Sequence, residues 1–116
     1  MSDTTRCTFC EIVAGRAPAT VLRETRDALV IVPLNPVTDG HVLVIPRWHV
    51  VDALEDPRIT AEVMHTAAEV ATRPCNIITS AGAVATQTVF HLHVHVVPRR
   101  ENDGLALPWT AGGGDE

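Results

Sequence analysis

Apolar and polar positions alternate most regularly near the C-terminal end, where residues 90–98 have the sequence FHLHVHVVP. Successive side chains of an extended strand point to opposite faces, so His91, His93 and His95 are expected to share one face and the apolar residues between them the other. A helix would scatter the three imidazoles around its axis, and the β-branched valines also favour a strand. Pro98 has no N–H group and is expected to end this strand.

Four shorter runs are rich in β-branched and other apolar residues and are also predicted to be strands: residues 21–24, 28–32, 41–46 and 75–79. Turn-forming residues separate them, most densely in the PLNPVTDG segment of residues 33–40. A Gly/Ala-rich loop at residues 80–86 leads into the histidine strand.

One segment has the pattern of a helix. Asp56 is suited to the N-cap and Pro57 to the first helical position. Apolar residues then recur at helical spacing on a face expected to pack on a sheet: Ile59, Val63, Ala67, Val70 and Ala71. The helix must end by Arg73, because Pro74 disfavours helical geometry in the residue before it.

These elements predict an α+β fold with a five-stranded antiparallel sheet and one main helix. The length of 116 residues is typical of a single domain, which we expect to span residues 7–110. Residues 1–6 and 111–116 are polar or glycine-rich and are expected to be disordered tails.

The composition narrows the classes of function. A formal net charge of −5 argues against general nucleic-acid binding, and no apolar run approaches the length of a membrane span. The polar N-terminal residues contain no secretory signal, so a cytoplasmic protein is expected. All nine basic residues are arginine, which excludes a Schiff-base lysine and a phosphate-loop lysine. Arg47, Arg99 and Arg100 could attract anions but are expected on the solvated surface.

The row of histidines is the strongest sign of chemistry in the chain. An imidazole titrates near neutrality and can act as a nucleophile, a proton carrier or a metal ligand. A single histidine on a strand is usually a partly exposed polar residue. Three in strict alternation, backed by an apolar face, indicate a functional site instead.

The residues around this row resemble a known family. The HLHVHVV sequence of residues 91–97 is similar to the signature of the histidine triad family, and the preceding QTV of residues 87–89 fits it as well. The GHVLVIPRWH sequence of residues 40–49 resembles a second segment of that family. Residues 7–15, CTFCEIVAG, resemble the N-terminal opening of its Hint-like branch.

The resemblance implies a hydrolase or transferase that acts at the α-phosphate of nucleoside 5′-phosphate derivatives such as phosphoramidates, with purine nucleotides favoured. His93 would attack the phosphorus to form a nucleotidyl-histidine intermediate, flanked by His91 and His95, and this chemistry needs no metal. Thr88 would stand near the leaving group. Four further residues match positions that contact the nucleotide: His41, Asn76, Gln87 and Leu34.

The sequence departs from the family pattern in two loops. Pro33 occupies the position at which many Hint-like proteins carry an acidic residue that binds the ribose hydroxyls, and proline offers no such hydrogen bond. The loop at residues 80–86 is longer than the Hint pattern and lacks the glycine that usually precedes the glutamine.

A Cys-x-x-Cys pair, Cys7 and Cys10, forms a second candidate site. In a small intracellular chain such a pair is more typical of a metal half-site or a redox pair than of a disulfide framework. The resemblance implies structural zinc, because some Hint-like proteins hold zinc with such a pair and two histidines that match His49 and His91. Four protein ligands would leave no open position on the metal. The alternative is a pair of reduced cysteines on a short turn.

Two other functions stay open at this stage. One is hydrolysis of dinucleoside polyphosphates, as in another branch of the family. The other is a zinc-stabilised nucleotide-binding module with little turnover. The resemblance also implies a homodimer with a small-molecule nucleotide as ligand, and no nucleic-acid or membrane partner is expected.

Overall fold

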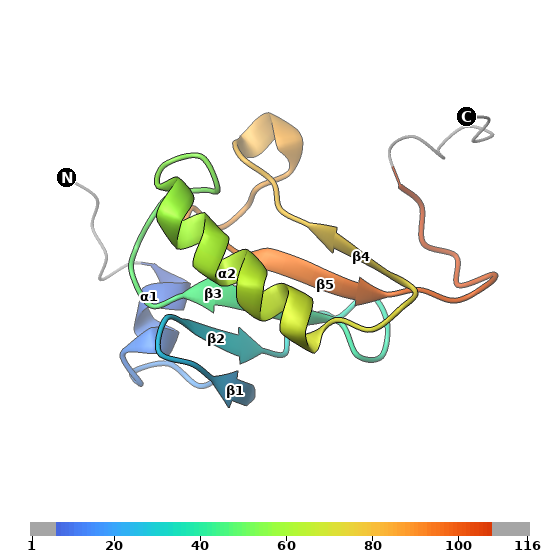
Figure 1. Ribbon diagram of the computed structural model, residues 1–116, viewed down its shortest axis with the longest axis horizontal. Helices are drawn as coiled ribbons and strands as arrows, with labels where there is room; N and C mark the ends of the chain where they lie inside the picture. The colour runs from blue at the N-terminus through green and yellow to red at the C-terminus, as the bar shows by residue number, and fades with distance from the viewer. Residues whose placement is uncertain (1–6, 108–116) are drawn as a thin grey trace.

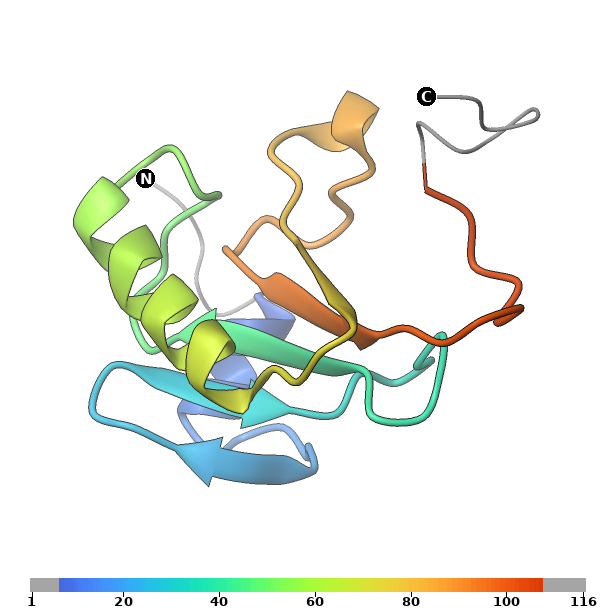
Figure 2. The ribbon, with the colours of Figure 1, turned by 45° about the vertical axis from the view of Figure 1, so that its right-hand side comes forward.

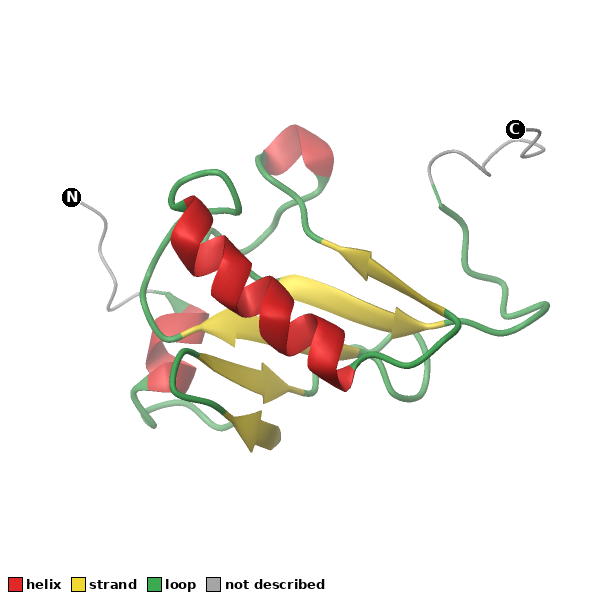
Figure 3. Ribbon diagram, in the orientation of Figure 1, coloured by secondary structure: helices red, strands yellow, loops and turns green. Residues whose placement is uncertain are grey.

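The computed structural model describes residues 7–107, so the two predicted tails and the end of the predicted domain lie outside the described residues. Five strands form one antiparallel sheet in the order β1-β2-β3-β5-β4 (Figures 1 and 3). Their bounds are β1 Val21–Glu24, β2 Ala28–Ile31, β3 Val42–Pro46, β4 Cys75–Ile78 and β5 Val94–Pro98. The helices are α1 Thr8–Val13, α2 Pro57–Val70 and a short 3-10 helix, η2, at Ala83–Ala85. The predicted α+β fold, with a five-stranded sheet and one main helix, is confirmed.

Helix α2 starts and packs as its sequence predicts. The Asp56 carboxylate accepts a hydrogen bond of 3.0 Å from the N–H of Arg58, which caps the helix, and Pro57 is its first residue. Val63 and Ala67 are fully buried against one face of the sheet, over which α2 lies in Figure 1. At 14 residues it is the longer α-helix, and within residues 7–107 no helix is long and apolar enough to cross a membrane.

Helix α1 packs on the opposite face of the sheet (Figure 2). Its Phe9 is buried in a second apolar cluster with side chains of β2 and β3: Leu29, Ile31, Leu43 and Ile45. Because α1 has fewer than two turns, it covers only part of this face. The histidine side chains occupy the neighbouring part.

The predicted histidine strand is correct in its faces but too long at its start. Leu92, Val94 and Val96 pack in the cluster under α2, as the alternation predicts. However, β5 begins only at Val94, and Phe90 is 47% exposed instead of buried. The N–H of Leu92 donates to the carbonyl of Val50 at 2.8 Å, so the residues before β5 bind the loop after β3 rather than the strand itself.

Candidate active site

His93 directly precedes β5, and a backbone hydrogen bond fixes the orientation of its imidazole. Its Nδ1 lies 2.8 Å from the carbonyl oxygen of His91, which can only accept a hydrogen bond, so Nδ1 carries the proton. In the neutral ring Nε2 then holds the lone pair. His93 lines a cavity of about 350 Å³ together with His41 and His95. The arrangement leaves Nε2 as a nitrogen that can attack an electrophile in this cavity.

The tautomers of His41 and His95 follow from one backbone contact. The N–H of Val37 donates to Nδ1 of His41 at 3.1 Å, so the neutral His41 ring carries its proton on Nε2. That Nε2 lies 3.0 Å from Nδ1 of His95 and donates to it. His95 must therefore present Nε2–H as a hydrogen-bond donor on the other side of its ring.

Burial keeps these two imidazoles neutral near pH 7. It lowers the pKa of His95 to about 4, helped by the neighbouring His93 and His41, and it also lowers the pKa of His41. Neutral rings preserve the chain of donors from Val37 to His95. Among the histidines of the cavity, His93 therefore offers a nucleophilic nitrogen and His95 offers an N–H donor beside it.

A second cavity, of about 500 Å³, lies beside α1. Its walls include Phe9, Ile12, Ile31 and Leu43, and none of the residues that line it has a charged side chain. The Phe9 ring also contacts His93, with 5.2 Å between ring centroids. A flat apolar group could be buried there next to the nucleophile.

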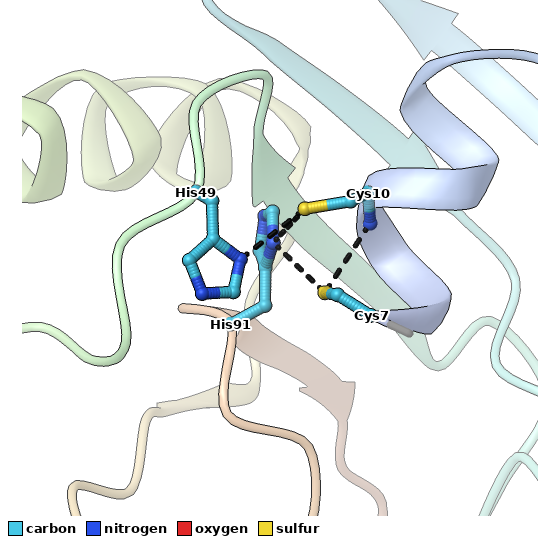
Figure 4. A group of neighbouring side chains, drawn as sticks. All are labelled: Cys7, Cys10, His49 and His91. Atoms are coloured by element: carbon cyan, nitrogen blue, oxygen red, sulfur yellow. Dashed lines mark hydrogen bonds between the residues drawn. The ribbon is translucent and has the colours of Figure 1, made fainter. Parts of the chain in front are cut away.

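The predicted metal ligands meet at the end of the histidine row (Figure 4). One ligand atom from each of Cys7, Cys10, His49 and His91 lies within 4.8 Å of the other three. Three sulfur–Nδ1 distances are 3.4 Å (Cys7 to His91), 3.2 Å (Cys10 to His49) and 3.5 Å (Cys10 to His91). Usual zinc bond lengths in a tetrahedron place sulfur and nitrogen ligands about 3.6 Å apart. The spacing therefore fits a shared metal ion.

The groups around this cluster also suit a metal. Nε2 of His91 lies 3.1 Å from the carbonyl oxygen of Pro46 and donates to it, so the lone pair of Nδ1 faces the two sulfurs. Burial lowers the pKa of His91 to about 4, which keeps the ring neutral. Burial and the neighbouring Cys7 raise the pKa of the Cys10 thiol to about 12, and a bound cation would counter this by stabilising the thiolate. These four residues could hold a metal ion.

Comparison with known proteins identifies the chain. A family profile described as the HIT domain matches residues 14–102, most of its length. The chain belongs to the HIT family. Its relatives include the adenosine 5′-monophosphoramidase HNT1 of Saccharomyces cerevisiae, 31% identical over 90% of this chain and 70% of the relative. Another is the adenylylsulfatase HINT3 of Arabidopsis thaliana, 32% identical over 85% of this chain and 55% of the relative.

A solved HIT structure bears on the cluster of predicted metal ligands. The zinc-bound histidine triad family protein of Mycobacterium smegmatis is 40% identical to this chain. The match covers 90% of this chain and 82% of the M. smegmatis chain, with a TM-score of 0.77. Cys7 and Cys10 precede the stretch that the HIT profile matches. The profile match therefore does not itself cover the cysteine pair, and the geometry of the pair is an observation beside it.

Besides the four residues of the metal-ligand cluster, three predicted site residues lie apart from the histidine cavity of this HIT protein. Gln87 is buried, and its amide anchors the loop: it accepts from the N–H of Gly82 and donates to the carbonyls of Val51 and Val89. Thr88 is exposed and does not line the cavity, whereas Ser80 and Thr86 do. Leu34 is 94% exposed and borders the second, apolar cavity.

Arg99 is placed differently from its prediction. Instead of lying on the solvated surface, its side chain is only 21% exposed and lines the histidine cavity beside Asn76. Its Nη1 donates to Oδ1 of Asn76 at 2.7 Å. The sequence shows the turn-forming residues after Arg99, but no pattern links Arg99 to Asn76 on β4.

Proposed function

We propose that this HIT protein cleaves nucleoside 5′-phosphate derivatives, phosphoramidates in particular, at the α-phosphorus through a nucleotidyl intermediate on His93. The observation that carries the proposal is the 2.8 Å hydrogen bond from Nδ1 of His93 to the carbonyl of His91, which leaves Nε2 as the reactive nitrogen in the cavity. No other described histidine combines a backbone-fixed Nδ1–H with a place on the cavity wall.

The reaction would proceed in two displacements. Nε2 of His93 forms a bond to phosphorus while the bond from phosphorus to the leaving nitrogen breaks. The amine departs with a proton from solvent water, which the Ser80 and Thr86 hydroxyls on the cavity wall could relay. Water then attacks the same phosphorus and releases the nucleoside monophosphate and the free imidazole. The Nε2–H group of His95 can stabilise the charge that develops on a phosphoryl oxygen in both steps.

The two cavities divide the substrate between them. The phosphate and leaving group would lie in the cavity of His93 and His95, and the base would lie in the apolar cavity beyond Phe9. The names of HNT1 and HINT3 both refer to adenosine 5′-phosphate compounds, which supports an adenine nucleotide as the first substrate to test.

We propose that the Cys7, Cys10, His49 and His91 cluster binds zinc. Two thiolates and two imidazoles match the ligands that Zn²⁺ prefers, and four protein ligands leave no position for a substrate. The ion would supply stability, by tying α1 to the segment before β5. Metal analysis of protein purified without added zinc tests this, with one equivalent expected; absence of stoichiometric metal would reject it.

We also propose a homodimer formed along β4. This strand is an edge of the sheet, and its Ile77 and Ile78 are 37% and 36% exposed. Ile77 stands opposite Val96, which packs in the cluster under α2, and α2 itself exposes Met64, so both residues offer apolar surface on the α2 side of the sheet. Sedimentation equilibrium tests the proposal, and a Met64→Glu, Ile77→Glu double variant should shift the mass to that of a monomer.

Intact-protein mass spectrometry after brief mixing with adenosine 5′-phosphoramidate tests the main proposal. A transient adenylyl adduct is expected on the wild type and absent from His93→Ala. His65→Ala is the matched control, because His65 lies exposed on α2 and should leave the adduct unchanged. Nucleotide binding without adduct or released amine would point to the binding module, and turnover of a dinucleoside polyphosphate alone would point to that branch.

A further inference from the structure

Arg99 is the centre of a polar cluster at the wall of the histidine cavity. Its Nε and Nη2 donate to the two carboxylate oxygens of Asp103 at 2.8 and 3.0 Å, and Nη2 also donates to the carbonyl of Leu105 at 2.7 Å. Its Nη1 donates to Oδ1 of Asn76 at 2.7 Å. Four of the five guanidinium N–H groups are therefore used inside the protein.

These contacts make Arg99 a poor direct ligand for a phosphate. The Asp103 carboxylate neutralises its charge, and that carboxylate is held by the N–H groups of Arg100 and Leu105 at 3.1 and 3.0 Å. The Asp103 side chain is only 5% exposed. Breaking the pair to free the guanidinium would leave a carboxylate without its partner in a shielded position.

The contact with Asn76 points to a different role. Asn76 lies on β4, opposite Val97 of β5, and lines the same cavity as His93 and His95. An amide can turn by 180°, which exchanges an acceptor for a donor. Because Arg99 can only donate, its bond selects the orientation in which the amide oxygen faces the guanidinium, and the NH₂ group is left as the end that can serve a ligand.

We propose that Arg99 is a positioning residue that acts through Asn76. It holds the Asn76 amide with its NH₂ group available as a hydrogen-bond donor to a phosphoryl oxygen of the substrate, alongside the Nε2–H of His95. This inference rests on the proposed function for its substrate. It goes further because it assigns Arg99, Asp103 and Asn76 to one chain of contacts.

A four-protein cycle tests whether the effect passes through Asn76: wild type, Arg99→Ala, Asn76→Ala and the double variant. Loss of one donor to a developing oxyanion typically lowers kcat by about 10²-fold or more. We expect Asn76→Ala to lose about that much, Arg99→Ala to lose roughly tenfold in kcat with little change in KM, and the double variant to match Asn76→Ala within about twofold. Two losses that multiply would overturn the proposal.

Two further variants separate geometry from charge. Arg99→Lys keeps the charge but lacks the planar fork, so it should lose about as much kcat as Arg99→Ala. Full rescue by lysine would overturn the proposal in favour of a simple electrostatic role. Arg100→Ala is the matched control, because only its backbone N–H is seen to contact the cluster and its side chain is exposed; its kcat should be unchanged.

Folding and the substrate need separate controls. If Arg99→Ala does not fold, as judged by urea unfolding, Asp103→Asn replaces it in the cycle. The Asp103→Asn, Asn76→Ala double variant should then have the kcat of Asn76→Ala alone. If the wild type neither turns over adenosine 5′-phosphoramidate nor binds AMP, the proposed function fails. The positioning of Asn76 is then decided by NMR of its side-chain NH₂ group, which should become more mobile in Arg99→Ala; unchanged mobility would overturn the inference.

Discussion

His91 and His95 lie four residues apart on the same face of one extended segment, yet they face different surroundings. His91 is fully buried and points Nδ1 at two sulfurs, whereas His95 points Nδ1 at the imidazole of His41 and lines a cavity. Burial lowers the pKa of both to about 4, so their charge state does not distinguish them. The difference lies in the opposing element: α1 brings thiols to one end of the row, and the segment before β3 brings a histidine to the other.

His93 joins the two regions. Its ring lies 5.2 Å from that of His95, while its Nδ1 is held by the carbonyl of His91. The cluster of predicted metal ligands and the histidine cavity therefore meet at one peptide group. Variants of His93 should change turnover, and variants of the Cys/His cluster should change stability. A variant that changes both would show that the carbonyl of His91 couples the two regions.

The largest expected effect is the loss of chemistry without loss of stability. His93→Gln should lower turnover of adenosine 5′-phosphoramidate by about 10⁴-fold or more, because the nucleophile is removed. Its urea midpoint and metal content should stay at wild-type values. A variant that lost bound metal as well would show that the two regions are not separable.

The reverse variant is His49→Ala in the metal cluster. It should lose stoichiometric metal and be less stable in urea unfolding by about 4 kcal/mol, the contribution of an ion present at roughly 1,000 times its Kd. Turnover at low temperature should fall less than about tenfold. Cys75→Ala is the matched control, since Cys75 is a free cysteine outside the cluster, and it should change neither metal content nor turnover.

The pH dependence of the free energy of unfolding should reveal that the His41–His95 pair is buried in its neutral form. With a pKa of about 4 in the folded protein and about 6.5 when unfolded, His95 binds its proton more readily in the unfolded chain, so the free energy of unfolding falls as the pH drops from 6.5 toward 4. His95→Gln should reduce that slope by up to about 1.4 kcal/mol per pH unit. Urea titrations at pH 7.5, 6.0 and 5.0 measure it, and an unchanged slope would contradict the burial of a neutral ring.

The smallest effect concerns the sugar. Pro33 lines the apolar cavity, where no lining side chain is charged, so the wild type should cleave ribo- and 2′-deoxyribonucleoside phosphoramidates at rates within about threefold of each other. Pro33→Asp should favour the ribonucleotide by roughly fivefold, about 1 kcal/mol for a partly exposed hydrogen bond. Pro18→Asp, at another lining position, is the control for added charge alone.

The features that the sequence predicts correctly are those that depend on a local pattern or on a motif. Alternation placed Leu92 and Val94 under α2 and the histidines opposite, and the capping residues located the start of α2. The proximity of the four predicted metal ligands is also present in the structure. The roles of His93 and of the other predicted site residues stay predictions.

Other features depend on contacts that no local pattern encodes. The alternation predicts that the strand starts at residue 90, but β5 starts at Val94. The difference arises because the N–H of Leu92 donates to the carbonyl of Val50, in a loop distant in sequence. The prediction of a surface position for Arg99 is wrong because its side chain is held between Asp103 and Asn76, and Asn76 lies on a different strand. Such side-chain networks become visible only when the strands are paired in space.

The contact between Cys7 and His91 spans 84 positions of the chain. With zinc bound, that contact ties together two segments at opposite ends of the domain, and because the site exists only in the folded chain, its binding free energy is lost when either segment opens. Helix α1, too short to persist alone, would then open only together with the segment that carries His93. Slow amide hydrogen exchange in α1, matching that of β5 and lost on chelation, would be the mark of a single cooperative unit.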